Sequence, residues 1–344
     1  MNRFFSLDTF KLVACFLVIF IHIPIGGDLG GIIMPLSRIA VPFFFMVSGF
    51  FIWDRNKNKL ISKINVQIKK IFRLVIVSNM IYLIWGILKL ILKQGDLLSY
   101  FKNLFSIKKV IALLIFNESP LSGHLWYVLA LLYVLIIYKY SIKFKYTKLI
   151  KNSIIILLLI DLAFGKYSLL IFGREFSYIL VRNFLFVGVP YFLIGNIIRE
   201  CYEKKELVRF ENKELIGFSI LFVVTSIIEK ESLLEFSLNA TRDHYISTTP
   251  LVICIFILAI NNKGAFKESI LPKLGEKYSL YIYIYHPIII DIFTTIISTN
   301  NMNNTFFNQY FAPIIVFTIT LGLSIGYNKF KNNVRKMYNK VCGQ

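Results

Sequence analysis

The segment FKLVACFLVIFIHIPI, residues 10–25, is a run of Leu, Val, Ile and Phe long enough to enter a lipid bilayer. It carries two ionisable side chains, Lys11 and His22. A helix turns about 100° and rises about 1.5 Å per residue, so eleven residues return the chain to nearly the same face roughly 16 Å away. Ionisable groups are costly in hydrocarbon, which makes each of these residues a candidate functional residue.

The composition of the whole chain also indicates a membrane protein. Its 344 residues are 56% hydrophobic, and the mean hydropathy is +0.66. The apolar runs recur in blocks of about twenty residues, the length that spans hydrocarbon. Polar stretches are too short for a core of their own. We therefore expect an all-α, polytopic membrane bundle that forms a single domain over residues 1–344, with no soluble domain.

Ten membrane spans are predicted. They cover residues 8–25, 33–53, 69–92, 122–139, 149–164, 178–198, 213–230, 246–261, 276–298 and 308–330. The fifth is short, and Pro287 is expected to interrupt the ninth. The first span has a basic start but no small-residue cleavage site, so it is interpreted as a retained helix rather than a signal peptide.

The distribution of lysine and arginine orients these spans. With both termini in the cytoplasm, the inside segments hold roughly 26 basic residues and the outside loops roughly 8, as the positive-inside rule requires. The net charge of +20 is thereby explained by loops that face anionic lipid headgroups. Nucleic acid is not an expected partner. The bacterial plasma membrane is the expected location.

The longest outside stretch, residues 93–123, mixes Leu, Phe and Ile with lysines. This pattern predicts an amphipathic helix lying on the outer surface. An eleventh span is the alternative.

Polar side chains gather in the outer halves of the predicted spans and predict an outward-open polar chamber, because such groups are tolerated only when they pair or line a wet cavity. They are His22, Arg38, His124, Asp161, Arg182, Glu229, His244, His286 and Asp291. A basic cluster is expected at the cytoplasmic end and consists of Lys11, Lys69, Lys70 and Arg73.

Structural roles compete with functional ones at most of these positions. Arginine–aspartate pairs such as Arg38–Asp161 or Arg182–Asp291 could simply tie helices together. A residue that flanks a span, as His124 and His244 do, is more typical of a surface or loop than of a catalyst. Lys69 and Lys70 could be ordinary positive-inside residues. His22 differs, because a neutral imidazole is a natural proton acceptor near pH 7.

Four segments resemble, in order, motifs of the acyltransferase 3 family of membrane proteins. They are Leu7-Asp8 with Lys11 and His22, the run RIAVPFFFMVSGF from Arg38, HLWY from His124, and YSLYIYIYHP ending at His286 and Pro287. The family has a bundle of about ten helices, in agreement with the span count. One departure is that Lys11 stands where the family has arginine. Lysine keeps the charge but lacks the planar bidentate fork of a guanidinium.

The resemblance implies transfer of an acyl group, commonly acetyl, from cytoplasmic acyl-coenzyme A to a hydroxyl of an extracytoplasmic acceptor such as a cell-envelope glycan. His22 would be the general base and Arg38 a catalytic cation, while the basic cluster of Lys11, Lys69, Lys70 and Arg73 would hold the coenzyme's phosphates. The acceptor-binding residues would be His124, Trp126, Asp161, Arg182, His286 and Asp291. No metal and no bound cofactor are expected.

A narrower resemblance is to the membrane half of the membrane-bound serine racemases of glycopeptide resistance. The segments RIAVPFFFMVSGFFIW, GHLWYVLALL and SLYIYIYHPI carry it. In that branch a cytoplasmic racemase domain follows the membrane half, which is associated with L-serine supply. No pyridoxal-phosphate domain is evident here, so racemisation is not expected. Uptake of L-serine is therefore the alternative to acyl transfer, with an arginine holding the carboxylate and Asp161 or Asp291 the ammonium.

Overall fold

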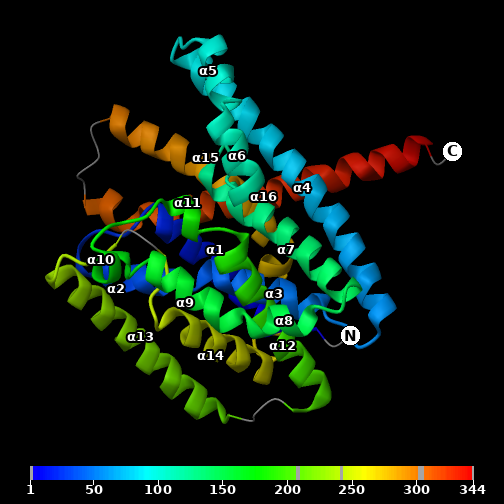
Figure 1. Cartoon of the computed structure of the whole chain (residues 1–344). Coiled ribbons are helices and arrows are strands. Elements are labelled where there is room, and N and C mark those ends of the chain that lie inside the picture. The colour runs from blue at the N-terminus through cyan, green and yellow to red at the C-terminus, as the bar shows by residue number, and fades with distance from the viewer. Residues whose placement is uncertain (1–2, 207–209, 241–242, 301–305, 343–344) are drawn as a thin grey trace. The chain divides into compact units, whose positions relative to one another are not determined.

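The computed structural model of the chain describes residues 3–206, 210–240, 243–300 and 306–342 (Figure 1). All regular secondary structure in these residues is helical. Two compact units are present: Met1–Ala40 with Ala259–Gln344 forms unit 1, and Val41–Leu258 forms unit 2. Segments from both ends of the sequence therefore build unit 1. The single-domain organisation stays a prediction.

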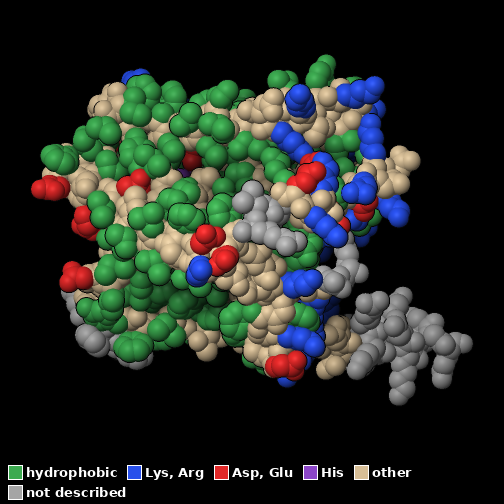
Figure 2. Space-filling model, turned by 90° about the horizontal axis from the view of Figure 1, so that it is seen from below, with side chains coloured by type: hydrophobic (Ala, Val, Ile, Leu, Met, Phe, Trp, Pro, Cys, Tyr) green, Lys and Arg blue, Asp and Glu red, His purple; other side chains and the backbone are tan. Residues whose placement is uncertain are grey.

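Among the described residues, seven helical segments are long and apolar enough to cross a membrane. They are Phe5–His22, Gly27–Ile52, Lys57–Leu92, Gly123–Lys143, Tyr178–Lys204, Leu271–Thr299 and Asn308–Asn333. The other three predicted spans coincide with two shorter apolar helices, α9 (Ile154–Phe164) and α14 (Thr248–Asn261), and with α13 (Asn212–Glu235). Apolar side chains cover much of the visible surface (Figure 2), as a lipid-facing protein requires. The polytopic helical membrane fold is confirmed.

Unit 1 is built on the packing of α1 (Phe5–His22) against α15 (Leu271–Thr299). At their crossing Gly275 lies against the backbone of Asp8, and a Cβ there would fall on the Asp8 carbonyl oxygen. The Cys15 thiol donates to the carbonyl of Ser279 at 3.4 Å. Two further helices, α2 (Gly27–Ser37) and α16 (Phe306–Cys342), complete the unit.

Unit 2 is centred on α7 (Trp126–Lys143), which packs against α4 (Lys57–Leu92) and the π-helix η2 (Phe184–Gly188). Helix α3 (Ala40–Ile52) meets α12 (Val189–Lys204) where Gly49 and Gly195 remove all side-chain bulk, as in close helix pairs of membrane proteins. The shorter elements of the unit are η1 (Gly123–Leu125), α8 (Thr147–Asn152), α10 (Ser168–Phe172) and α11 (Tyr178–Val181).

Prolines explain two departures from the predicted spans. The first helix ends at His22 rather than 25, because Pro24 forces Ile23 into an extended conformation, with φ −129° and ψ 91°. The second predicted span is split into α2 and α3 around Arg38. Pro42 causes this break, since it has no N–H for the Arg38 carbonyl and its ring clashes with that carbonyl.

The predicted interruption at Pro287 is wrong, because α15 continues from Leu271 to Thr299 through the proline. Pro287 brings no N–H to the carbonyl of Tyr283 four residues earlier. The neighbouring His286 ring donates from Nδ1 to the carbonyl of Ile282 at 3.0 Å. This bond goes to the carbonyl adjacent to the one that the proline leaves without its backbone donor.

The sixth predicted span is also broken, at residues 182–183, and side chains satisfy the interrupted backbone. Asn183 Oδ1 accepts the N–H groups of Leu185 and Phe186 at 2.9 and 3.1 Å. Asn117 Oδ1 accepts the N–H of Phe184 at 2.8 Å. The chain therefore leaves α11 at Arg182 and re-enters as η2. Such π-turns are frequent at functional sites.

Two long polar stretches differ from the prediction. The predicted inner segment 54–70 is largely helical, because α4 begins at Lys57 with Asn56 as its N-cap. With 36 residues, α4 is about 54 Å long, well beyond the hydrocarbon thickness. The single outer amphipathic helix is two short helices instead, α5 (Leu97–Leu104) and α6 (Ile107–Phe116), which do not form a continuous eleventh span.

Candidate functional site

Unit 1 places a pair of histidines between α1 and α15. The His22 and His286 rings lie 5.3 Å apart between centroids, at a mutual tilt of 42°. His286 is fully buried, whereas His22 is the last residue of α1 and is exposed. The first span was predicted to continue to residue 25, but α1 ends at His22, so this residue occupies the end of the span.

The His286 hydrogen bond defines the state of its ring. A carbonyl oxygen only accepts, so His286 Nδ1 must carry the proton that bonds to Ile282 O. The Nε2 atom of the neutral ring is therefore the one with the lone pair. Two neighbouring imidazoles do not both ionise readily, because like charges repel. The pair is thus suited to hold one proton at a time.

Lys11 lies on the same face of α1 as Cys15 and His22, the face that meets α15, as the spacing predicts. Its ammonium is 2.9 Å from Asp8 Oδ1. The other Asp8 oxygen accepts from Arg3 at 3.0 Å, and Arg3 also pairs with Glu276 of α15 at 2.8 Å. Charge at this end of unit 1 is therefore shared through a network rather than concentrated on one lysine.

The remaining residues of the predicted catalytic and donor sites lie apart along the chain. Arg38 is half-buried at the break between α2 and α3. Lys69, Lys70 and Arg73 are exposed on α4, about four turns from its start. Asp291 is half-buried on α15, five residues beyond His286.

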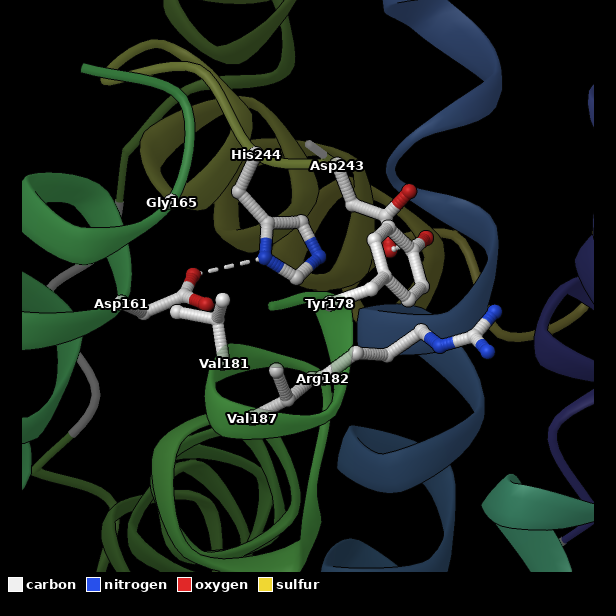
Figure 3. A pocket seen from close by; sticks show the side chains of 8 residues that line it. All are labelled: Asp161, Gly165, Tyr178, Val181, Arg182, Val187, Asp243 and His244. Carbon is white, nitrogen blue, oxygen red and sulfur yellow. Dashed lines mark hydrogen bonds and ion pairs between the residues drawn. The ribbon is translucent and has the colours of Figure 1, made fainter. Parts of the chain in front are cut away.

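Unit 2 contains a second polar site, which is a pocket of about 230 Å³ including its open mouth (Figure 3). Asp161 on α9 and His244 on the loop before α14 form its buried wall, and each has a side-chain exposure of only 6–7%. The Asp161 carboxylate lies 2.7 Å from His244 Nδ1. Val181, Val187 and Gly165 supply the apolar remainder of the lining.

The other side of the pocket is aromatic and acidic. The Tyr178 hydroxyl donates to Asp243 at 2.5 Å. The Arg182 guanidinium stacks on the Tyr178 ring, 4.0 Å from its centroid, and also lies 5.4 Å from the Trp126 ring. Figure 3 shows the Arg182 side chain passing Tyr178 and ending on the far side from His244.

Arg182 is balanced by a carboxylate outside the pocket. Glu118 Oε1 lies 3.6 Å from the guanidinium. Burial raises the pKa of Glu118 above its ordinary value, and the positive charge of Arg182 opposes that rise. Asp161 and Arg182 therefore have partners other than the arginine–aspartate pairs weighed from the sequence, namely His244 and Glu118.

The two histidines that flank predicted spans, His124 and His244, are both buried. His244 is bonded to Asp161, and His124 accepts or donates at 2.8 Å with Ser122 while its ring meets Tyr82 at 4.7 Å. The surface alternative weighed for both residues is wrong, because the short turns flanking the spans fold back into unit 2. His244 was expected among the polar residues of the chamber, whereas Asp243 and Tyr178 were not predicted as site residues. Their one local signal is a polar Asp-His dipeptide between two apolar segments.

Fold and sites together define a multi-pass helical membrane protein with ionisable groups buried among its helices. Residues 4–327 match the family described as an acyltransferase domain, Acyl_transf_3. The chain belongs to this acyltransferase 3 family, which supports a transferase-type enzyme in the membrane.

A more distant similarity is to an amino-acid racemase of Enterococcus faecalis. The two sequences are 24% identical over 314 residues, which cover 85% of this chain and 40% of the racemase. The chain thus spans about two fifths of that protein's length. No solved structure matches the chain.

Proposed function

We propose that this protein transfers an acyl group, commonly acetyl, from cytoplasmic acyl-coenzyme A to a hydroxyl of an extracytoplasmic acceptor such as a cell-envelope glycan. The family match across residues 4–327 carries the proposal, because it includes α1 with Lys11 and His22 on one face. The cell membrane of a bacterium is the proposed location.

His22 is the proposed general base. Its imidazole takes the proton of the acceptor hydroxyl while the oxygen forms a bond to the thioester carbonyl carbon. The carbon–sulfur bond then breaks, and the coenzyme thiolate takes the proton back from the imidazolium. The position of His22 at the C-terminal end of α1 suits this role, because the helix dipole stabilises a cation there. Arg38 is proposed to stabilise the oxyanion.

His286 is proposed to assist through Nε2, by accepting a hydrogen bond from the His22 ring. Glutamine places its amide oxygen near the Nε2 position, where it can accept the same bond, whereas asparagine keeps only a donor near Nδ1 that reaches Ile282. We expect His286→Gln to retain a substantial part of kcat and His286→Asn to lose roughly tenfold or more, the loss typical of a hydrogen bond to a charged group. Steady-state kinetics of acyl transfer measures both. The reverse order would show that the bond to Ile282, rather than Nε2, is what matters.

The donor's phosphates are proposed to bind the basic side chains Lys11, Lys69, Lys70 and Arg73. Lys11→Arg is expected to keep or raise activity, because arginine keeps the charge and adds a bidentate fork that also fits Asp8. Lys11→Ala should raise KM for acetyl-coenzyme A. A large loss of activity in Lys11→Arg would mean that the ammonium itself has a specific role.

Uptake of a small amino acid such as L-serine is the second candidate. Two observations favour it. One is the relative named amino-acid racemase. The other is the small pocket of unit 2, whose lining includes the carboxylates of Asp161 and Asp243 and the guanidinium of Arg182. Calorimetric titration of the purified chain with acetyl-coenzyme A and with L-serine separates the candidates. Binding of acetyl-coenzyme A, followed by its acceptor-dependent cleavage, supports acyl transfer. Binding of L-serine alone supports uptake.

A further inference from the structure

Asn117 joins three segments of unit 2 that are far apart in the sequence. It is fully buried and ends α6 in the left-handed conformation, with φ 52° and ψ 27°, which asparagine tolerates better than most residues. Its Nδ2 donates to the carbonyl of Trp126 at 3.1 Å, at the start of α7. Its Oδ1 accepts the N–H of Phe184 at 2.8 Å, at the start of η2. A carbonyl only accepts and an N–H only donates, so the amide makes both bonds in one orientation alone.

The segments that Asn117 joins carry three side chains that lie close together. Glu118 follows it directly, Trp126 is the residue whose carbonyl it binds, and Arg182 precedes η2 by two residues. The Arg182 guanidinium lies 5.4 Å from the Trp126 ring and 3.6 Å from Glu118 Oε1. A Cβ built on Gly123 would lie 3.8 Å from Arg182 Nη2, so the same loop continues beside the guanidinium.

The position of Arg182 depends on how the chain re-enters the helix after the break. Arg182 has φ −82° and ψ 73°, so helical geometry does not set the direction of its side chain. The first N–H groups of a helix have no partner within it, and at η2 one of these groups belongs to Phe184. Asn117 satisfies that group from a distant part of the chain. It thereby fixes the backbone two residues after Arg182, a separation of at most about 7 Å.

We propose that Asn117 is a positioning residue, which holds the Arg182 guanidinium between Trp126 and Glu118 in the orientation that binds the acceptor. This inference rests on the proposed function, in which Arg182 and Trp126 belong to the acceptor site. Arg182 also lines the pocket of unit 2 (Figure 3). Exact placement of such a group matters, because a misplacement of about 1 Å can lower a rate by about 10²-fold.

Asn117→Gly tests this role, because it removes both hydrogen bonds while glycine readily adopts the same positive φ. Transfer of labelled acetyl from acetyl-coenzyme A to envelope material should fall by roughly 10- to 100-fold in kcat/KM. KM for acetyl-coenzyme A should stay unchanged, since other residues are proposed to bind the donor. Gln94→Gly is the matched control and should leave the rate unchanged, because Gln94 also has φ 52° but is exposed.

A double-mutant cycle with Arg182→Gln separates positioning from a contribution to folding alone. If Asn117 acts through Arg182, then Asn117→Gly should cause less than about a twofold further loss of acyl transfer in the Arg182→Gln background. The same fractional loss in both backgrounds would overturn the proposal. Wild-type activity of Arg182→Gln would overturn it as well, because the positioned group would then have no role.

A second measurement does not depend on acyl transfer. Replacing Trp53 and Trp85 by phenylalanine leaves Trp126 as the one tryptophan of the three in the chain. We expect Asn117→Gly to change the fluorescence emission of Trp126 less in the Arg182→Gln background, because displacement of the guanidinium no longer contributes. Equal changes in both backgrounds would refute the positioning role. If the wild-type chain transfers no acyl group, the proposed function fails, and the emission cycle still decides whether Asn117 positions Arg182.

Discussion

His22→Ala is expected to abolish acyl transfer while the protein remains inserted and folded. General-base catalysis contributes about 10²–10⁴-fold, so kcat should fall by that factor with little change in KM for the donor. The side chain is exposed at the end of α1, and its removal leaves no cavity in the core of unit 1. Transfer of labelled acetyl from acetyl-coenzyme A to envelope material in isolated membranes measures the effect.

Val13→Ala is the control on the same helix, because Val13 is 43% exposed and has no proposed role. It should leave the rate unchanged. His22→Gln is a second variant, which keeps side-chain size and polarity but removes the basic nitrogen. Full turnover in a purified His22→Ala protein would refute the assignment of His22 as the base.

Gly275→Ala is expected to produce the largest loss of stability. A methyl group at this position would overlap the backbone carbonyl of Asp8 and approach the Leu12 amide at 3.3 Å, and neither backbone atom can turn aside as a side chain does. Overpacking of this kind typically costs about 1–3 kcal/mol, because the helices must separate. Since the displaced turn also carries Asp8, the partner of Lys11, activity should fall together with the thermal unfolding temperature.

Gly217→Ala provides the matched comparison. Gly217 also lies within a long helix, α13, but nothing lies within 4 Å of a Cβ built there. Alanine is favoured over glycine inside a helix by about 0.5–1 kcal/mol, so this variant should be neutral or slightly more stable. Equal unfolding temperatures of the two variants in detergent would contradict the close packing of α1 on α15.

Much of the helical architecture could be predicted, because each membrane span is recognisable from its own run of apolar residues. Every one of the ten predicted apolar segments overlaps a helix or a run of short helices. The prolines were harder to interpret, because the loss of one backbone hydrogen bond does not by itself decide whether a helix ends. At Pro42 the helix breaks, whereas at Pro287 it continues. The break at Asn183 required Asn117, 66 residues earlier, which no local pattern identifies.

The candidate sites also differ in whether they are formed by residues near in sequence or by residues far apart. Lys11 and His22 share a face because helical periodicity alone places them there, and Asp8 follows as the residue one turn before Lys11. Asp161 and His244 are 83 residues apart, and their hydrogen bond depends on how α9 and the loop before α14 pack. A position beside a span could be predicted for His244, but its burial against Asp161 and the pocket that it shares with Tyr178 and Asp243 could not.

The sequence by itself determined that the chain is a helical membrane protein, where its spans lie and which α1 residues share a face, because bilayer thickness and helical periodicity act on neighbouring residues. Only the tertiary structure decided which ionisable groups become partners. In hydrocarbon a polar side chain must find a partner wherever the packing offers one, and that partner commonly lies on a helix distant in sequence. The buried Asp161–His244 pair and the His22–His286 pair both arise in this way.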